Sequence, residues 1–252
     1  MNTQVQRWCA WSAVPVIGLL FAGLLIAGFL PPVAPSHSAE ALKEIFVQHQ
    51  GRIRVGMLIG LLGTGFLGPF VAVITVQLKR IEGPRSPLAY AQLMLGVMLP
   101  VVLILPLTWL EGAAYRADRD AASIQVFSDQ AWLLIVGAFY AFVVQMACTG
   151  LAILRDDSAS PVFPRWLAYL NFWFAIGSLP AAGVYFFQDG PLAWNGLLSF
   201  WLPAACFGGW ALVMMVMVLR AVDQPEPPAP DIDRLAERVA ELLREKGLRG
   251  AG

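Results

Sequence analysis

Charged residues are scarce in this chain. Only 13% of its 252 residues are Asp, Glu, Lys or Arg, whereas 58% are hydrophobic. Ordinary soluble domains contain about 25% charged residues. This shortage excludes a conventional water-soluble domain, because a water-facing surface needs charged side chains. The formal net charge is zero, so the charge balance gives no indication of a nucleic-acid partner.

Cysteine and histidine are also rare. The three cysteines, Cys9, Cys148 and Cys206, lie far apart and form no C-x-x-C pair, which argues against a disulfide framework or a zinc site. The two histidines, His37 and His49, have acidic neighbours but show no H-x-x-x-H, H-E-x-x-H or H-x-H spacing. We therefore expect no metal ion, no cofactor and no catalytic residue, and we favour a non-catalytic protein over an enzyme.

Long apolar runs fill most of the sequence. A helix needs about 20 apolar residues to cross the hydrocarbon core of a bilayer, and six runs approach or exceed this length. They cover approximately residues 12–30, 53–78, 88–110, 130–154, 166–187 and 196–219. The sequence therefore predicts an all-α fold, a polytopic bundle of six membrane spans over residues 1–220. A proline-rich linker over 221–230 and an amphipathic C-terminal helix over 231–252 are expected to follow.

The second run carries a line of small residues at intervals of four. On a helix these residues form one ridge with little side-chain bulk, which permits close approach of another helix in lipid. The ridge consists of Gly56, Gly60, Thr64, Gly68 and Ala72. Pro69 lies within the run and leaves the Gly65 carbonyl without its helical N–H partner, so we expect a kink there. We expect this helix near the centre of the bundle.

The expected spans contain amides and hydroxyls rather than charges. A set of these residues, together with one aromatic residue half-way along span five, defines a candidate ligand pocket: Gln92, Gln145, Thr149, Asn171 and Trp173. The alternative is that the polar members form hydrogen bonds between spans, which average about 0.6 kcal/mol in membranes. Both interpretations are open at this stage, and the second is the more usual role.

Two amphipathic helices are expected outside the spans. Ser38 can cap the first, a surface helix in the loop between spans one and two. The second is in the C-terminal tail, where Ile232, Leu235, Val239 and Leu242 follow the 3-4-3 spacing of a coiled-coil seam. Two heptads seldom hold alone in water. The tail helix therefore needs a partner, which would be its own copies, another membrane protein or the membrane surface.

The distribution of positive charge predicts the orientation. The two termini, loop two and loop four share one side of the membrane and contain twelve lysines and arginines, against five on the other side. Cytoplasmic loops carry an excess of these residues. We therefore expect both termini in the cytoplasm. Without the residues of the tail the bias is seven against five.

Several stretches resemble an uncharacterised family of bacterial six-span membrane proteins. They are QLKRIEGPRSPLAYAQL, GLAILRD, PVFPRWLAYLNFW and GPLAWNGLLSFWLP, and the resemblance covers about residues 7–220. It implies a six-span bundle in the bacterial inner membrane. It carries over no activity, cofactor or catalytic residue.

Three functions fit the sequence. The first is a non-catalytic membrane component that binds a partner protein or a lipid-like, hydrophobic molecule. The second is a small transporter or homo-oligomeric pore for a neutral or weakly polar solute, with the amides and hydroxyls along its path. The third is a membrane enzyme that acts on a hydrophobic substrate through loop histidines and carboxylates, and it has the least support because no nucleophile or metal spacing is present.

Overall fold

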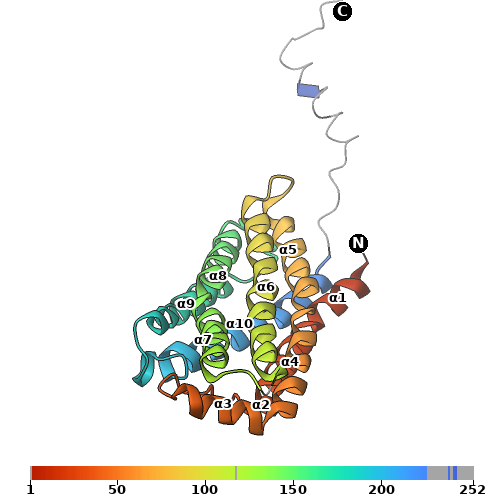
Figure 1. The fold of residues 1–252 in the computed structure, drawn as a ribbon. Helices are drawn as coiled ribbons and strands as arrows, with labels where there is room; N and C mark the ends of the chain where they lie inside the picture. The colour runs from red at the N-terminus through yellow and green to blue at the C-terminus, as the bar shows by residue number, and fades with distance from the viewer. Residues whose placement is uncertain (1, 117, 226–237, 239–240, 243–252) are drawn as a thin grey trace, which may run out of the picture.

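Six helical segments long enough to cross a membrane make up the bundle (Figure 1). The structure is a computed structural model that describes residues 2–116, 118–225, 238, 241 and 242. Within these residues every regular element is a helix. The six segments are Thr3–Ala27, Gln50–Glu82, Pro87–Tyr115, Ala121–Leu154, Arg165–Tyr185 and Gly190–Asp223. The predicted all-α bundle of six spans is therefore confirmed.

Only the third segment is one unbroken helix, α6 (Pro87–Tyr115). The first segment consists of α1 (Thr3–Trp11) and α2 (Ala13–Ala27), the second of α4 (Gln50–Thr64) and α5 (Leu67–Glu82), and the fourth of α7 (Ala121–Gly137) and α8 (Phe139–Leu154). The fifth consists of α9 (Arg165–Ser178) and the 3-10 helix η1 (Leu179–Tyr185). The sixth consists of the 3-10 helix η2 (Gly190–Leu192), the π-helical η3 (Leu197–Trp201) and α10 (Leu202–Asp223). Irregular backbone inside a membrane is tolerated only where protein covers it or where it lines a cavity. The breaks therefore point to the parts of the bundle with a special role.

The break between α4 and α5 has a local cause. α4 ends at Thr64 and α5 begins at Leu67, so the interruption falls at Gly65 and Phe66. Gly65 is four residues before Pro69, whose ring lacks the N–H that this carbonyl needs and clashes with it. The structure therefore interrupts the second span at the place where Pro69 predicts a kink.

The short helix α3 (Ala39–Gln48) lies across the end of the bundle opposite the termini (Figure 1). The Ala41 N–H donates to the Ser38 hydroxyl at 3.2 Å, so Ser38 is the expected cap. Leu42 and Phe46 are buried, and the Phe46 ring lies 5.6 Å from the ring of Phe29. The apolar face of this amphipathic helix therefore packs onto the bundle.

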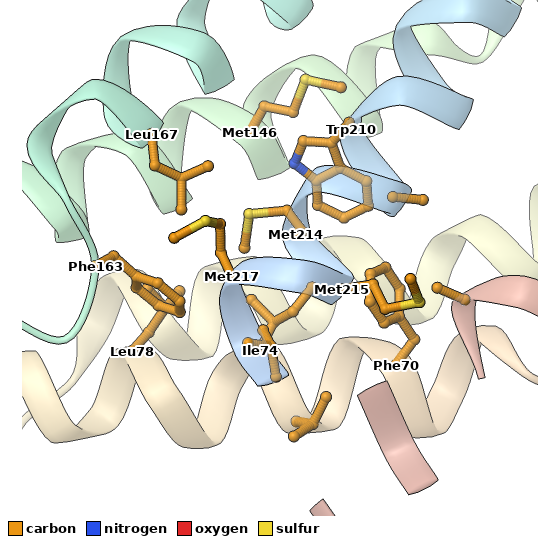
Figure 2. Close-up of a cluster of buried hydrophobic side chains, with 14 of the residues drawn as sticks. Phe70, Ile74, Leu78, Met146, Phe163, Leu167, Trp210, Met214, Met215 and Met217 are labelled. Atoms are coloured by element: carbon orange, nitrogen blue, oxygen red, sulfur yellow. The ribbon is translucent and has the colours of Figure 1, made fainter. Parts of the chain in front are cut away.

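Two groups of buried apolar side chains form the core, one toward each end. Figure 2 shows the group nearer the termini, where α5, α8, α9 and α10 converge. It contains Phe70, Ile74 and Leu78 of α5 together with a set of methionines from α8 and α10. Methionine is unbranched and fills irregular gaps between helices. The Trp210 ring of α10 packs edge-on against the Phe70 ring, with the ring centroids 5.8 Å apart.

The first and last spans meet at one end of the bundle. Arg7 of α1 and Asp223 of α10 form an ion pair at 2.6 Å, and Figure 1 shows the start of the chain beside the end of α10. An even number of spans places both termini at the same end of the bundle, and the ion pair brings the first and last spans together there. α10 extends to Asp223, slightly beyond Arg220, where the membrane domain was expected to end.

Candidate functional site

The structure separates the five residues of the predicted pocket. Gln92, Gln145 and Thr149 are fully buried among α5, α6 and α8. The Thr75 hydroxyl lies 2.7 Å from Gln92 Oε1. A Cβ placed on Gly96, one turn along α6, would lie 2.8 Å from Gln145 Nε2. These three predicted residues therefore occupy one region of tight helix packing.

Asn171 and Trp173 lie elsewhere. The Trp210 indole N–H donates to Asn171 Oδ1 at 2.9 Å, and Asn171 Nδ2 donates to the Leu167 carbonyl at 2.8 Å. Asn171 therefore joins α9 to α10 and has its hydrogen bonds satisfied. Trp173 is 68% exposed on the outer surface of α9, so it contributes no wall to an internal pocket.

The buried amides of Gln92 and Gln145 are incompletely paired. Gln92 Nε2 and both side-chain polar atoms of Gln145 have no hydrogen-bond partner within the described residues. An unpaired buried polar atom costs about 1–3 kcal/mol. Close packing around Gly96 leaves no room for a ligand beside these amides. A site with enough volume for a ligand lies in another part of the bundle.

Such a site lies half-way along spans three and four, in a cavity of about 140 Å³ that we call the inner cavity. Residues from α2, α6, α7, α8, α9, η3 and α10 line it. Phe142, Phe200 and Phe207 provide aromatic walls, and the polar lining consists of the hydroxyls of Ser178 and Ser199. The cavity is similar in size to an engineered apolar cavity that stays dry and binds benzene.

Broken helices surround the inner cavity on several sides. α7 gives way to α8 at Ala138, α9 gives way to the 3-10 helix η1 after Ser178, and the π-helical turn η3 precedes α10. Pro180 lies at the start of η1, where its ring prevents a regular continuation of α9. The inner cavity is therefore the place where irregular backbone gathers inside the bundle.

The two hydroxyls are engaged by the protein itself. Ser178 Oγ donates to the Phe174 carbonyl at 2.9 Å. Ser199 Oγ lies within hydrogen-bond distance of the carbonyls of Pro180 and Leu192, at 3.0 and 2.8 Å. None of the described residues that line the inner cavity carries a charge. Chemically, this mainly apolar arrangement suits an apolar guest.

The small-residue ridge makes a close contact over part of its length. A Cβ on Gly23 of α2 would overlap the Gly56 carbonyl oxygen and lie 2.8 Å from the Gly60 nitrogen. Thr64 is buried, and its hydroxyl donates to the Leu61 carbonyl at 2.7 Å. The N-terminal part of the ridge therefore packs against α2.

The C-terminal part of the ridge lies outside this contact. A Cβ on Gly68 would have no atom within 4 Å, and Ala72 is exposed. The close approach instead includes Gly63, where a Cβ would lie 3.0 Å from the Leu19 Cβ. The break after Thr64 turns the rest of the span, which explains why the four-residue line does not stay on one partner. Gly23 and Gly63 are contact residues that the spacing did not identify.

The loop histidines do not converge with acidic residues. His37 Nδ1 lies 3.0 Å from the Ala34 carbonyl, and His49 is exposed between α3 and α4. Within the described residues no three His, Cys, Asp or Glu side chains come together as a metal-binding group.

The tail helix is mostly outside the structure's described residues. Ile232, Leu235 and Val239 fall there, whereas Leu242 is described and exposed. The predicted coiled-coil seam and the proline-rich linker therefore stay predictions.

No protein-family model, curated protein or solved structure matches this chain. The class that the fold defines is an integral membrane protein with six helical spans. Its functional assignment rests on the geometry of its own residues.

Proposed function

We propose that this protein is a non-catalytic membrane component that binds a hydrophobic, lipid-like molecule and holds a small apolar part of it in the inner cavity. The observation that carries the proposal is the apolar lining of the inner cavity, whose two hydroxyls already have protein partners. An apolar guest gains about 25 cal/mol for each Å² of surface removed from water. A guest that enters the inner cavity from the bilayer leaves hydrocarbon and not water, so this gain is small. Shape and dispersion contacts therefore select the guest.

We further propose a bacterial inner-membrane location with both termini in the cytoplasm. The excess of lysine and arginine on the side of the termini supports this orientation. The C-terminal helix, through Ile232, Leu235, Val239 and Leu242, would bind a second copy or a partner membrane protein at the cytoplasmic surface.

The test of the proposed function is to fill the inner cavity. Ala204 lines it, whereas the next residue of α10, Ala205, is exposed. Ala204→Phe should displace lipid-like molecules that co-purify with the protein in mild detergent, as measured by native mass spectrometry. Ala205→Phe is the matched control and should retain them. If both variants carry the same bound molecules as the original protein, the inner cavity is not the binding site.

A second candidate, transport of a small apolar solute, is favoured by the broken helices around the inner cavity. Discontinuous spans near a central site are typical of secondary transporters. In reconstituted vesicles, transport would appear as solute flux that Ala204→Phe abolishes. A binding component would show retention of the guest without flux.

A further inference from the structure

A second hollow, which we call the rim pocket, lies beside the segment that connects spans five and six. Its volume of about 500 Å³ is within the range of about 300–1,000 Å³ that is common for small-molecule sites. Gln125, Asp129 and Leu133 line it from α7. These residues are four apart, so they share one helix face. The other walls are mainly aromatic, from residues 185–187 and Trp194.

Hydrogen bonds hold the aromatic walls in place. The Trp194 indole N–H donates to the Val33 carbonyl at 2.7 Å, which fixes the ring against the first loop. The Phe187 backbone N–H donates to the Gly183 carbonyl at 3.0 Å. The Ser199 hydroxyl stabilises the same region through hydrogen bonds with the carbonyls of Pro180 and Leu192. These bonds fix the Trp194 ring and the backbone that carries the other aromatic walls.

Among the described residues that line the rim pocket, Asp129 alone is charged. It lies eight residues past the first residue of α7, inside the fourth membrane-spanning segment. The expected start of span four was about residue 130, so the sequence placed Asp129 in a loop. No ion pair among the described residues includes its carboxylate. Arg119, which precedes α7, lies over the Phe127 ring, 4.8 Å from the ring centroid.

An ionisable side chain within a spanning segment normally pairs with another group or faces a cavity, and such a residue marks a candidate functional site. The choice of partner follows from the other walls. A metal cation such as Ca²⁺ or Mg²⁺ needs about six oxygen ligands, which the Asp129 carboxylate and the amides of Gln125 and Gln188 do not supply. Aromatic faces attract a large, weakly hydrated cation through the negative charge of the ring face.

We propose that the rim pocket binds an organic ammonium cation that carries methyl groups, such as the choline group. Its charge faces the Asp129 carboxylate, and its methyl groups pack on Tyr185, Phe187 and Trp194. The same chemistry is present in a free quaternary ammonium solute and in the headgroup of a choline lipid. This site is separate from the inner cavity and does not depend on the function proposed for it.

The test is calorimetric titration of the purified full-length protein with choline in detergent that lacks choline groups. Saturable binding is expected, with quenching or enhancement of tryptophan fluorescence from the Trp194 wall. 3,3-Dimethylbutan-1-ol has the shape of choline without its charge and should bind at least about tenfold more weakly. Asp129→Asn should cause a similar loss, because it removes the charge while preserving the shape.

Asp189→Asn is the matched control, because Asp189 is exposed in the neighbouring turn and does not line the rim pocket. It should leave choline affinity unchanged. Thermal unfolding of each variant separates loss of the site from loss of the fold, and Phe187→Leu supplies a second, uncharged change that should also weaken binding. Equal affinity for choline and its neutral analogue, or unchanged affinity in Asp129→Asn, would overturn the proposal. Absence of saturable binding to the folded protein would do the same.

Nanodiscs distinguish the two sources of the cation. If phosphatidylcholine in the disc suppresses binding of free choline relative to phosphatidylglycerol, a lipid headgroup occupies the rim pocket. If the two discs give the same affinity, the ligand is a free solute. Either result supports an organic-cation site and identifies its natural source.

Discussion

The hydrogen bond between Asn171 and Trp210 is the clearest polar connection between two spans. Both side chains are buried, and the donor–acceptor distance is 2.9 Å. Asn171→Leu should leave the indole N–H without an acceptor in an apolar interior. We expect a loss of about 1–3 kcal/mol in unfolding free energy, measured in detergent. Thr108→Val, which removes an exposed hydroxyl bonded only within its own helix, should have little effect.

A double-mutant cycle checks the cause. Trp210→Phe removes the donor, so Asn171→Leu should cost less in that background than in the original protein. Equal costs in both backgrounds would show that packing, and not the hydrogen bond, explains the loss.

At the same scale, Asp120 caps α7 outside the membrane. Its carboxylate accepts hydrogen bonds from the Ser123 hydroxyl and backbone N–H at 2.6 and 2.9 Å, and these bonds lower the pKa of Asp120. A lowered folded-state pKa gives stability that is present above the unfolded pKa and is lost as the pH falls through the folded value. The protection of the amides at the start of α7 against hydrogen exchange, after correction for the intrinsic rate at each pH, should therefore decrease in acid below about pH 4. In Asp120→Asn this acid dependence should be absent, and its persistence would contradict the assignment.

Residue types were easier to predict than residue partners. The sequence identified Gln92, Gln145, Thr149 and Asn171 as buried polar residues, and all four are buried. It did not identify Trp210 as the partner of Asn171, because these residues are 39 positions apart and their contact depends on how α9 and α10 pack. The exposure of Trp173 likewise depends on helix rotation, which an apolar sequence with little amphipathic pattern does not define.

At the scale of the element, the contact between α2 and α4 depends on the absence of side chains. A Cβ on Gly56 would lie 2.8 Å from both the Ala27 nitrogen and Cβ. Gly56→Leu should force the two helices apart, with a cost of about 1–3 kcal/mol or more on the overpacking scale. Gly68→Leu is the control, because its Cβ meets open space. Thermal unfolding in detergent measures both, and equal stability of the two variants would place the ridge outside the helix contact.

The structure also changes what Gly63 is expected to do. By helical spacing it lies about 60° from Gly60, so spacing alone predicts that a larger side chain at Gly63 has little effect on stability. Its Cβ would instead come within 3.2 Å of the Leu20 nitrogen, so Gly63→Leu should be harmful as well. Regular spacing predicted a close helix contact, but the Pro69 break and the path of α2 determine which small residues take part.

At the scale of the whole molecule, the number of spans follows from the apolar runs alone, since lipid demands helices of a minimum length. The inner cavity and the rim pocket do not, because each combines residues from distant elements. Asp129 shows what hydropathy does not predict. Hydropathy places the start of span four after this charge, at about residue 130, whereas α7 begins at Ala121 and includes Asp129.

The tail should control assembly and not folding. Its predicted seam is too short to be stable alone, and the last spanning helix, α10, ends before it at Asp223. Deletion of residues 226–252 should lower the mass of the detergent-solubilised complex, or release a partner, while thermal unfolding of the bundle stays the same. Light scattering and co-purification measure the first effect. An unchanged mass and unchanged partners would remove the proposed role of the tail.

The orientation of the bundle is testable through its two ends. The Arg7–Asp223 pair places the first and last spans side by side at one end, whereas α3 lies at the other (Figure 1). Lysine and arginine favour the end with the termini by twelve to five, and by seven to five without the tail. We therefore expect a fluorescent protein that folds only in the cytoplasm to be active when fused after Asp223. Alkaline phosphatase, which needs the periplasm, should be active when inserted beside His37. Because the bias survives removal of the tail, the deletion of residues 226–252 should preserve both results. Activity of the two reporters in the opposite positions would place the termini on the periplasmic side and contradict the proposed orientation.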